Sequence, residues 1–112
     1  MANILARDLQ DYVLPLPLDS LNAARFLAEL SLPIDLLHLD AAHDFQSVNA
    51  DLRAWWPLIR PGGLLIGDDY SRAWPGVMKA FRRLSEQQDA PLEASKGKCR
   101  LRKPPATRAL PR

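Results

Sequence analysis

Residues 34–70 read IDLLHLDAAHDFQSVNADLRAWWPLIRPGGLLIGDDY, and this stretch decides the fold. Two short apolar runs, IDLLHL and LLIG, flank a segment whose apolar residues recur every three or four positions. Such runs are typical of buried strands, and the recurring spacing is typical of a helix. The stretch therefore predicts a strand, a helix and a second strand. Because IDLLHL lacks alternation, we expect its strand to lie in a parallel sheet that is buried on both faces.

Acidic residues follow both predicted strands. Asp40 and His43 come after the first strand, and Asp68 and Asp69 come directly after the second. A right-handed crossover between parallel strands places their carboxyl ends side by side. In open α/β sheets, ligands bind beyond these ends. We therefore expect three carboxylates and one imidazole to form a functional site on one rim of the sheet.

The segment before residue 34 predicts three further elements. Residues 2–9 have a weak helical pattern, and residues 12–16 predict a short strand that Pro15 and Pro17 cut off. Asp19 or Ser20 can cap a helix that ends before Pro33. One face of this helix is expected to carry the apolar side chains of Ala23, Phe26, Leu27 and Leu30.

The remaining chain predicts helices and a hairpin. Asp44 or Ser47 can cap the helix after the first strand, and Pro57 should kink or end it. A PGG turn then leads into a strand at 64–67, and a helix begins at Trp74-Pro75 and runs to about residue 88. Residues 91–94 and 98–103 predict a terminal hairpin whose second segment alternates like an edge strand. We expect the last nine residues to be disordered.

Composition restricts the class of protein. The 112 residues are 47% hydrophobic, which fits one domain with a small core. No apolar run approaches the roughly 20 residues of a membrane span, and the single Cys99 excludes an internal disulfide. We therefore expect a cytoplasmic protein without membrane association. Residues 1–95 carry 8 basic and 13 acidic side chains, so the net positive charge lies in the tail and does not favour nucleic-acid binding.

The order of these motifs resembles a known family. The segments PLPLDS, DLLHLDAAHDF, WWPLIRPGGLLIGDDY, WPGV and GKCRLRK follow one another as in the C-terminal half of class I S-adenosylmethionine-dependent methyltransferases, in the metal-dependent O-methyltransferase-like branch. The resemblance implies an α/β fold, a partial Rossmann-like methyltransferase sheet that is mostly parallel and has a C-terminal antiparallel edge hairpin. It covers residues 1–103 as the C-terminal half of the domain and leaves 104–112 as a basic tail.

The resemblance also implies roles for particular residues. Asp40, Asp68 and Asp69 would ligate a magnesium-like ion that holds the hydroxyl of a small-molecule acceptor and lowers its pKa. His43 would act as a general base or orient the acceptor. Asp19 and Ser20 would approach the adenine of S-adenosylmethionine, and Asp40 would be a further cofactor contact.

Simpler roles remain open for these residues. Asp19 and Ser20 could only cap a helix, Asp40 could be a helix cap, and either Asp68 or Asp69 could orient the other. His38 is expected to be a hydrogen-bonded core residue. Tyr70 and Trp74 could pack in the core or form a wall of the acceptor pocket. A metal-dependent lyase or hydrolase is also compatible with three carboxylates.

The sequence departs from the family in one large respect. The family's first strand, its glycine-rich loop and the acid that holds the ribose would all precede residue 1, and no glycine of this chain stands in such a loop. We therefore expect either a fragment of a longer enzyme or a shortened relative, with one long strand left as an exposed edge. Two hypotheses follow: a methyltransferase acting on an oxygen, or a non-catalytic module that forms homo-oligomers or binds a partner through this edge.

Overall fold

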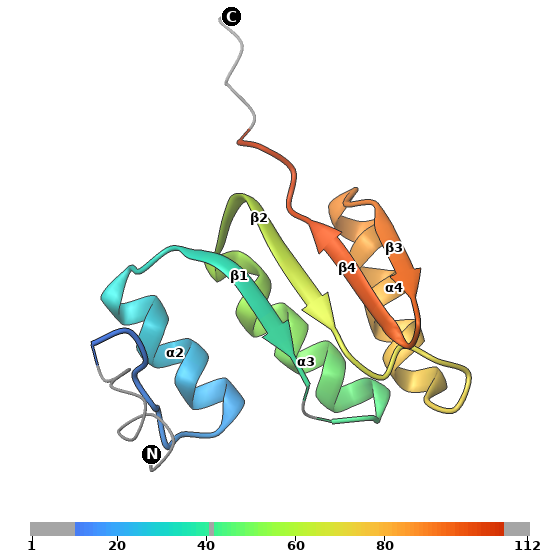
Figure 1. Cartoon of the computed structure of the whole chain (residues 1–112), viewed down its shortest axis with the longest axis horizontal. Helices are drawn as coiled ribbons and strands as arrows, with labels where there is room; N and C mark the ends of the chain where they lie inside the picture. Colours follow the sequence, from blue (N-terminus) through green and yellow to red (C-terminus); the bar gives the residue numbers. More distant parts are fainter. Residues whose placement is uncertain (1–10, 41, 107–112) are drawn as a thin grey trace, which may run out of the picture.

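A computed structural model describes residues 11–40 and 42–106. Figure 1 shows helices on one side of a small sheet. In chain order the elements are α2 (Ser20–Leu30), β1 (Ile34–Leu39), α3 (Phe45–Trp55), the 3₁₀ helix η1 (Trp56–Leu58), β2 (Ile59–Gly67), α4 (Pro75–Gln88), β3 (Leu92–Ser95) and β4 (Lys98–Arg102). None of the helices among these residues is long and apolar enough to cross a membrane.

The sheet has the strand order β1-β2-β4-β3. β1 and β2 are parallel, and β2 pairs with β4 in the antiparallel direction, as does β3. The predicted α/β fold with a parallel pair and a C-terminal antiparallel hairpin is confirmed. One detail is wrong: the second segment of the hairpin, β4, lies inside the sheet between β2 and β3. The alternation of polar and apolar residues in β4 does not mark an edge strand. Cys99 and Leu101 face the core, whereas Lys98, Arg100 and Arg102 face away from it.

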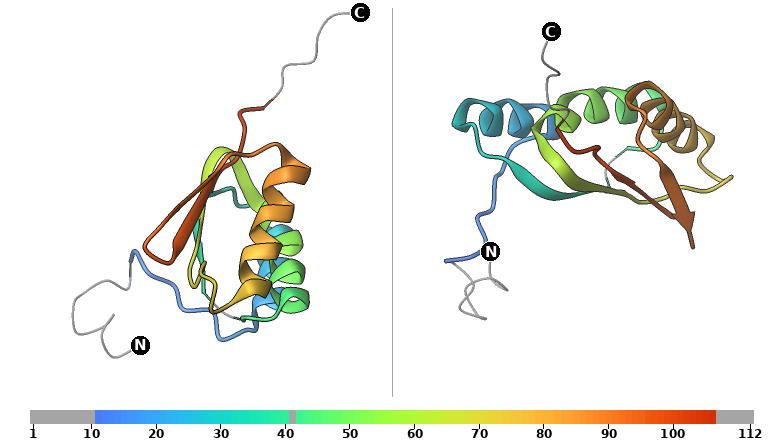
Figure 2. Two further views of the ribbon diagram at one scale, coloured as in Figure 1. Left: turned by 90° about the vertical axis from the view of Figure 1, so that its right-hand side faces the viewer. Right: turned by 90° about the horizontal axis from the view of Figure 1, so that it is seen from above.

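The core lies between the sheet and the helices. Figure 2 shows α2, α3 and α4 on the same face of the sheet. The largest fully buried side chains lie on this side and belong to Phe81, Leu52, Ile59, Leu65, Leu101 and Val77. Gly67 is part of this packing, since a Cβ atom there would come within 2.3 Å of the Phe81 ring. The tight contact between β2 and α4 thus requires a residue without a side chain.

The second face of the sheet is open. Leu36 on β1 is 56% exposed, and the His38 side chain on the same strand is 47% exposed. The prediction that β1 is buried on both faces is therefore wrong, and so is the prediction of a core position for His38. The physical reason is that, within residues 11–40 and 42–106, no helix packs on this face.

Most predicted helix boundaries agree with the structure. Asp19 caps α2 by accepting a hydrogen bond from the Asn22 amide at 2.8 Å, and Asp44 caps α3 through the Ser47 amide at 2.9 Å. β1 spans its predicted residues, and α4 begins with Pro75 at its first position. Both caps follow from local chemistry, because Asp side chains accept hydrogen bonds from the unpaired amides of a first helical turn.

Other predictions differ from the structure. Residues 12–16 form no strand, and β2 begins at Ile59, so that the PGG segment lies within the strand. The pairing accommodates it by a register shift, with Ile34 opposite Ile59 but Leu36 opposite Leu64. On α2 the predicted apolar face is only partly buried, because Phe26 is 40% exposed and Leu30 is 49% exposed. The predicted helix at 2–9 and most of the predicted disordered tail lie outside the described residues.

Candidate functional site

The carboxyl ends of β1 and β2 meet at one rim of the sheet. Leu39 lies opposite Gly67, and the Asp68 amide donates to the Leu39 carbonyl at 3.2 Å. Asp40 and Asp68 are thus the first residues after two paired strand ends. Asp40, Asp68 and Asp69 line one small cavity of about 10 Å³. The structure brings the three predicted carboxylates to the same place, because the paired parallel strands β1 and β2 end at the same edge of the sheet.

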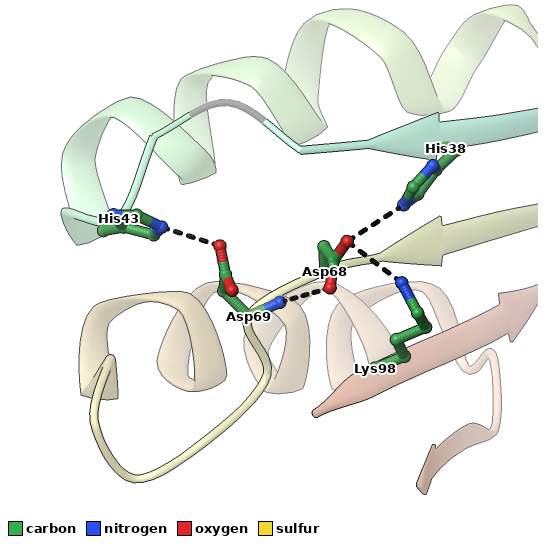
Figure 3. Close-up of polar contacts among 5 residues, drawn as sticks. All are labelled: His38, His43, Asp68, Asp69 and Lys98. Atoms are coloured by element: carbon green, nitrogen blue, oxygen red, sulfur yellow. Dashed lines mark hydrogen bonds and ion pairs between the residues drawn. The ribbon is translucent and has the colours of Figure 1, made fainter. Parts of the chain in front are cut away.

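His43 contacts the second of the two adjacent acids. Its Nε2 atom lies 2.7 Å from Oδ2 of Asp69, and its ring stacks on Trp74 with the ring centroids 3.8 Å apart and 14° between the planes (Figure 3 shows the polar contact). Asp69 has a φ of 57°, a left-handed conformation that Asp tolerates better than most residues. The turn after β2 therefore directs this carboxylate toward the loop that carries His43.

Close backbone packing supports this arrangement. A Cβ atom on Gly76, in the first turn of α4, would come within 2.7 Å of the Phe45 amide nitrogen and 2.9 Å of the His43 carbonyl oxygen. Only glycine allows the start of α4 to approach this loop so closely. Trp74 precedes α4 by one residue, so this approach brings its ring against His43.

Asp68 has different partners. Its Oδ2 atom lies 3.0 Å from Nζ of Lys98 and 3.5 Å from Nε2 of His38, while Oδ1 accepts the Asp69 amide at 3.0 Å (Figure 3). The hydrogen bond from Lys98 is the main cause that holds the pKa of Asp68 below its usual range. Sequence reasoning missed Lys98. The signal lay in the hairpin register, because Gly67 pairs with Cys99 and places Lys98 beside Asp68.

Asp51 is a second residue that the sequence did not single out. It is the one buried charged side chain of the described core, at 7% exposed, and it lines the same small cavity as the rim carboxylates. Its position on α3 follows from the helical period, one turn after Val48. A carboxylate at a core position of the helix after β1 could have been recognised as unusual from the pattern alone.

The predicted cofactor contacts already have partners in the fold. Both Asp19 oxygens accept hydrogen bonds from Asn22, and Ser20 Oγ accepts from the Trp55 indole at 2.8 Å. The latter bond joins the start of α2 to α3. Figure 1 places the start of α2 at the same end of the molecule as the carboxyl end of β1. Asp40, by contrast, is exposed at that end.

Of the two aromatic residues considered for a pocket wall, only one faces solvent. Tyr70 is buried at 9% exposed, and its hydroxyl accepts a hydrogen bond from Nε of Arg82 at 2.9 Å. Trp74 is 41% exposed and carries the stacking contact with His43.

A magnesium ion at this rim would need several oxygen ligands around one centre and room for its bound waters. Within the part of the chain that the structure describes, no group of three or more His, Cys, Asp and Glu side chains is arranged to hold a metal. A cavity of about 10 Å³ has room for about one water molecule, whereas magnesium binds octahedrally and keeps several waters. As arranged, the rim does not fit hydrated magnesium.

Comparison with known proteins identifies the family. The sequence model of a family described as a methyltransferase domain matches residues 1–70, more than half of the chain. This chain belongs to that methyltransferase family. The predicted resemblance to class I S-adenosylmethionine-dependent methyltransferases is thereby confirmed. No curated protein matches the chain.

Solved structures with the methyltransferase fold agree with this assignment. The apo structure of CalS11, a TDP-rhamnose 3'-O-methyltransferase of calicheamicin biosynthesis, is 28% identical over 75% of this chain and 38% of its own length, with a TM-score of 0.60. An O-methyltransferase from Bacillus cereus in complex with SAH is 22% identical over 91% of this chain and 56% of its own length, with a TM-score of 0.64; at this identity it supports the fold alone. The methyltransferase chain thus spans about half or less of the structures that it matches.

Proposed function

We propose that this chain carries the acceptor side of an S-adenosylmethionine-dependent O-methyltransferase site, with His43 as the general base. The observation that carries the proposal is the 2.7 Å contact between His43 Nε2 and the Asp69 carboxylate. A carboxylate only accepts hydrogen bonds, so Nε2 carries the proton and Nδ1 is the nitrogen that can take another. Asp69 thus sets the tautomer, and the stack on Trp74 sets the plane of the ring.

The chemistry follows from this geometry. When bound, S-adenosylmethionine supplies an electrophilic methyl group. His43 Nδ1 would take the proton of a hydroxyl on a small-molecule acceptor, so that the hydroxyl oxygen could accept the methyl group and S-adenosylhomocysteine would leave. The Asp69 carboxylate stabilises the imidazolium that results, and Trp74 covers one face of its ring. No step of the proposal uses a metal ion.

Asp40 is the proposed cofactor contact on this rim. It is exposed at the carboxyl end of β1, where ligands of open α/β sheets bind. Asp19 and Ser20 stay predicted adenine contacts; their side chains are engaged in capping α2 and in the bond to Trp55, so any contact from them would add to these roles.

Calorimetric titration of the full chain with S-adenosylmethionine tests the cofactor part of the proposal. We expect micromolar binding that Asp40→Asn weakens strongly. Asp35→Asn is the matched control, since Asp35 lies at the opposite end of β1 and pairs with Arg60. An absence of heat at millimolar cofactor contradicts the proposal for this chain.

Release of S-adenosylhomocysteine, measured with sugar and catechol acceptors, tests the role of His43. His43→Gln should lower the methyl-transfer rate by about 100-fold or more while cofactor binding is retained. His38→Gln is the control, because His38 lies on the same rim beside Asp68. Equal rates for both variants exclude His43 as the base.

A non-catalytic interaction module is the second candidate. The position of β1 supports it, because β1 is an edge strand of the described sheet and its Leu36 side chain is 56% exposed. An edge of this kind can pair with a second copy of the chain. Concentration-dependent dimerisation without any cofactor binding would favour this candidate over the first.

A further inference from the structure

The two adjacent acids after β2 are held by different cationic or imidazole groups. Lys98 and His38 both approach Oδ2 of Asp68, at 3.0 and 3.5 Å, whereas Asp69 Oδ2 faces His43. Figure 3 shows these contacts, together with the hydrogen bond from the Asp69 amide to Asp68 that joins the two acids. The two carboxylates therefore have different partners, although both residues border the same cavity.

Lys98 reaches Asp68 because of the hairpin. β4 starts at Lys98, and the pairing of Cys99 with Gly67 places the two side chains next to each other at the rim. Cys99, the next residue of β4, is 2% exposed and belongs to the hydrophobic core, so core packing holds the start of this strand. The fold therefore places the Lys98 ammonium group beside Oδ2 of Asp68. This oxygen would have to be free for Asp68 to bind a metal ion.

An ammonium group and a divalent ion compete for the same carboxylate oxygen. Both are positive and both seek an anionic oxygen, so a metal ion at Asp68 has to displace Lys98 and then bear its repulsion. The lowered pKa of Asp68, caused first by Lys98, agrees with a charged pair at neutral pH.

We propose that Lys98 takes the place of a divalent cation at this rim, as a positioning residue that holds Asp68 and supplies the positive charge of the acceptor site. The role of Lys98 in the acceptor site rests on the proposed function. Its effect on the binding of divalent ions does not. The wild-type chain then binds divalent ions only weakly, and removal of the ammonium group opens Asp68, next to Asp40 and Asp69, to a metal.

The test is a titration of the full chain with Mn²⁺, followed by the paramagnetic resonance signal of the free ion. Wild type should leave the ion free up to millimolar concentrations, and Lys98→Gln should raise the affinity by about tenfold or more. Adding Asp68→Asn to Lys98→Gln should remove the gain. Lys96→Gln, in the adjacent turn, is the matched control and should behave as wild type.

Two results overturn the proposal. The first is micromolar Mn²⁺ binding by wild type that Asp68→Asn abolishes, and the second is an unchanged affinity in Lys98→Gln. Circular dichroism checks the fold of each variant, and Lys98→Met replaces Lys98→Gln if the amide disturbs it. This experiment measures metal affinity and not methyl transfer. If His43 is not the general base, the expected Mn²⁺ affinities stay the same, so the two proposals can fail separately.

Discussion

The two faces of the sheet are formed by the same strands but differ in what covers them in the described part of the chain. On the helix side, Leu65 is 1% exposed and packs among Phe81 and other core residues. On the other side, Leu36 is 56% exposed although it belongs to the same apolar pattern. Burial stabilises in proportion to the apolar area removed from water. Within the described residues, most of the stabilising burial therefore lies on the helix-covered face of the sheet.

The largest effect should come from the covered face. Leu65→Ala should lower the free energy of unfolding by about 2–5 kcal/mol, because it removes buried methyl groups and leaves a cavity. Urea unfolding followed by circular dichroism measures this loss. A loss below about 1 kcal/mol would mean that the helix side is not the tightly packed core that it forms in this structure.

A smaller loss of stability is expected from a substitution where α4 meets the loop that carries His43. Gly76→Ala places a Cβ atom 2.7 Å from the Phe45 amide nitrogen, and relief of this clash should cost about 1–3 kcal/mol. The same shift should separate Trp74 from His43. Loss of the stacking contribution to the His43 proton shifts in an NMR spectrum would report it; unchanged shifts would show that the contact is independent of this approach.

The covered face should also protect the single thiol. Burial raises the pKa of Cys99 to about 12, far above the usual value of about 8.5. Because the folded pKa is the higher one, the thiol's contribution to stability is complete below pH 8.5 and is lost as the pH rises toward 12. A thiol-reactive disulfide reagent at pH 8.5 should label Cys99 only after unfolding. Rapid labelling of the native chain would show that the helix-covered face does not protect Cys99 from solvent.

The smallest effect is expected on the open face. Leu36→Ser should change the free energy of unfolding by no more than about 0.5 kcal/mol, as at other exposed positions. Urea unfolding checks this value, and analytical ultracentrifugation shows whether the variant self-associates less than wild type. A loss as large as that of Leu65→Ala would mean that a second copy covers Leu36 in solution.

The site could be predicted only in part. The strand ends placed Asp40, Asp68 and Asp69 on one rim, because parallel strands that pair side by side end at the same edge of the sheet. Which side chain pairs with which acid was not predicted. Lys98 is 30 residues from Asp68 along the chain, and His43 is 26 residues from Asp69. No local periodicity reports contacts of this range.

By itself, the sequence determined the elements. Caps at Asp19 and Asp44, the apolar run of β1, the helix start at Pro75 and the hairpin all follow from local hydrogen bonding and hydrophobic spacing. The tertiary structure alone shows which face of β1 is covered, that β4 lies inside the sheet, and that Lys98 pairs with Asp68 and His43 with Asp69. The physical reason is that burial and ion pairing depend on which segments meet in space, and strand order and register set these meetings.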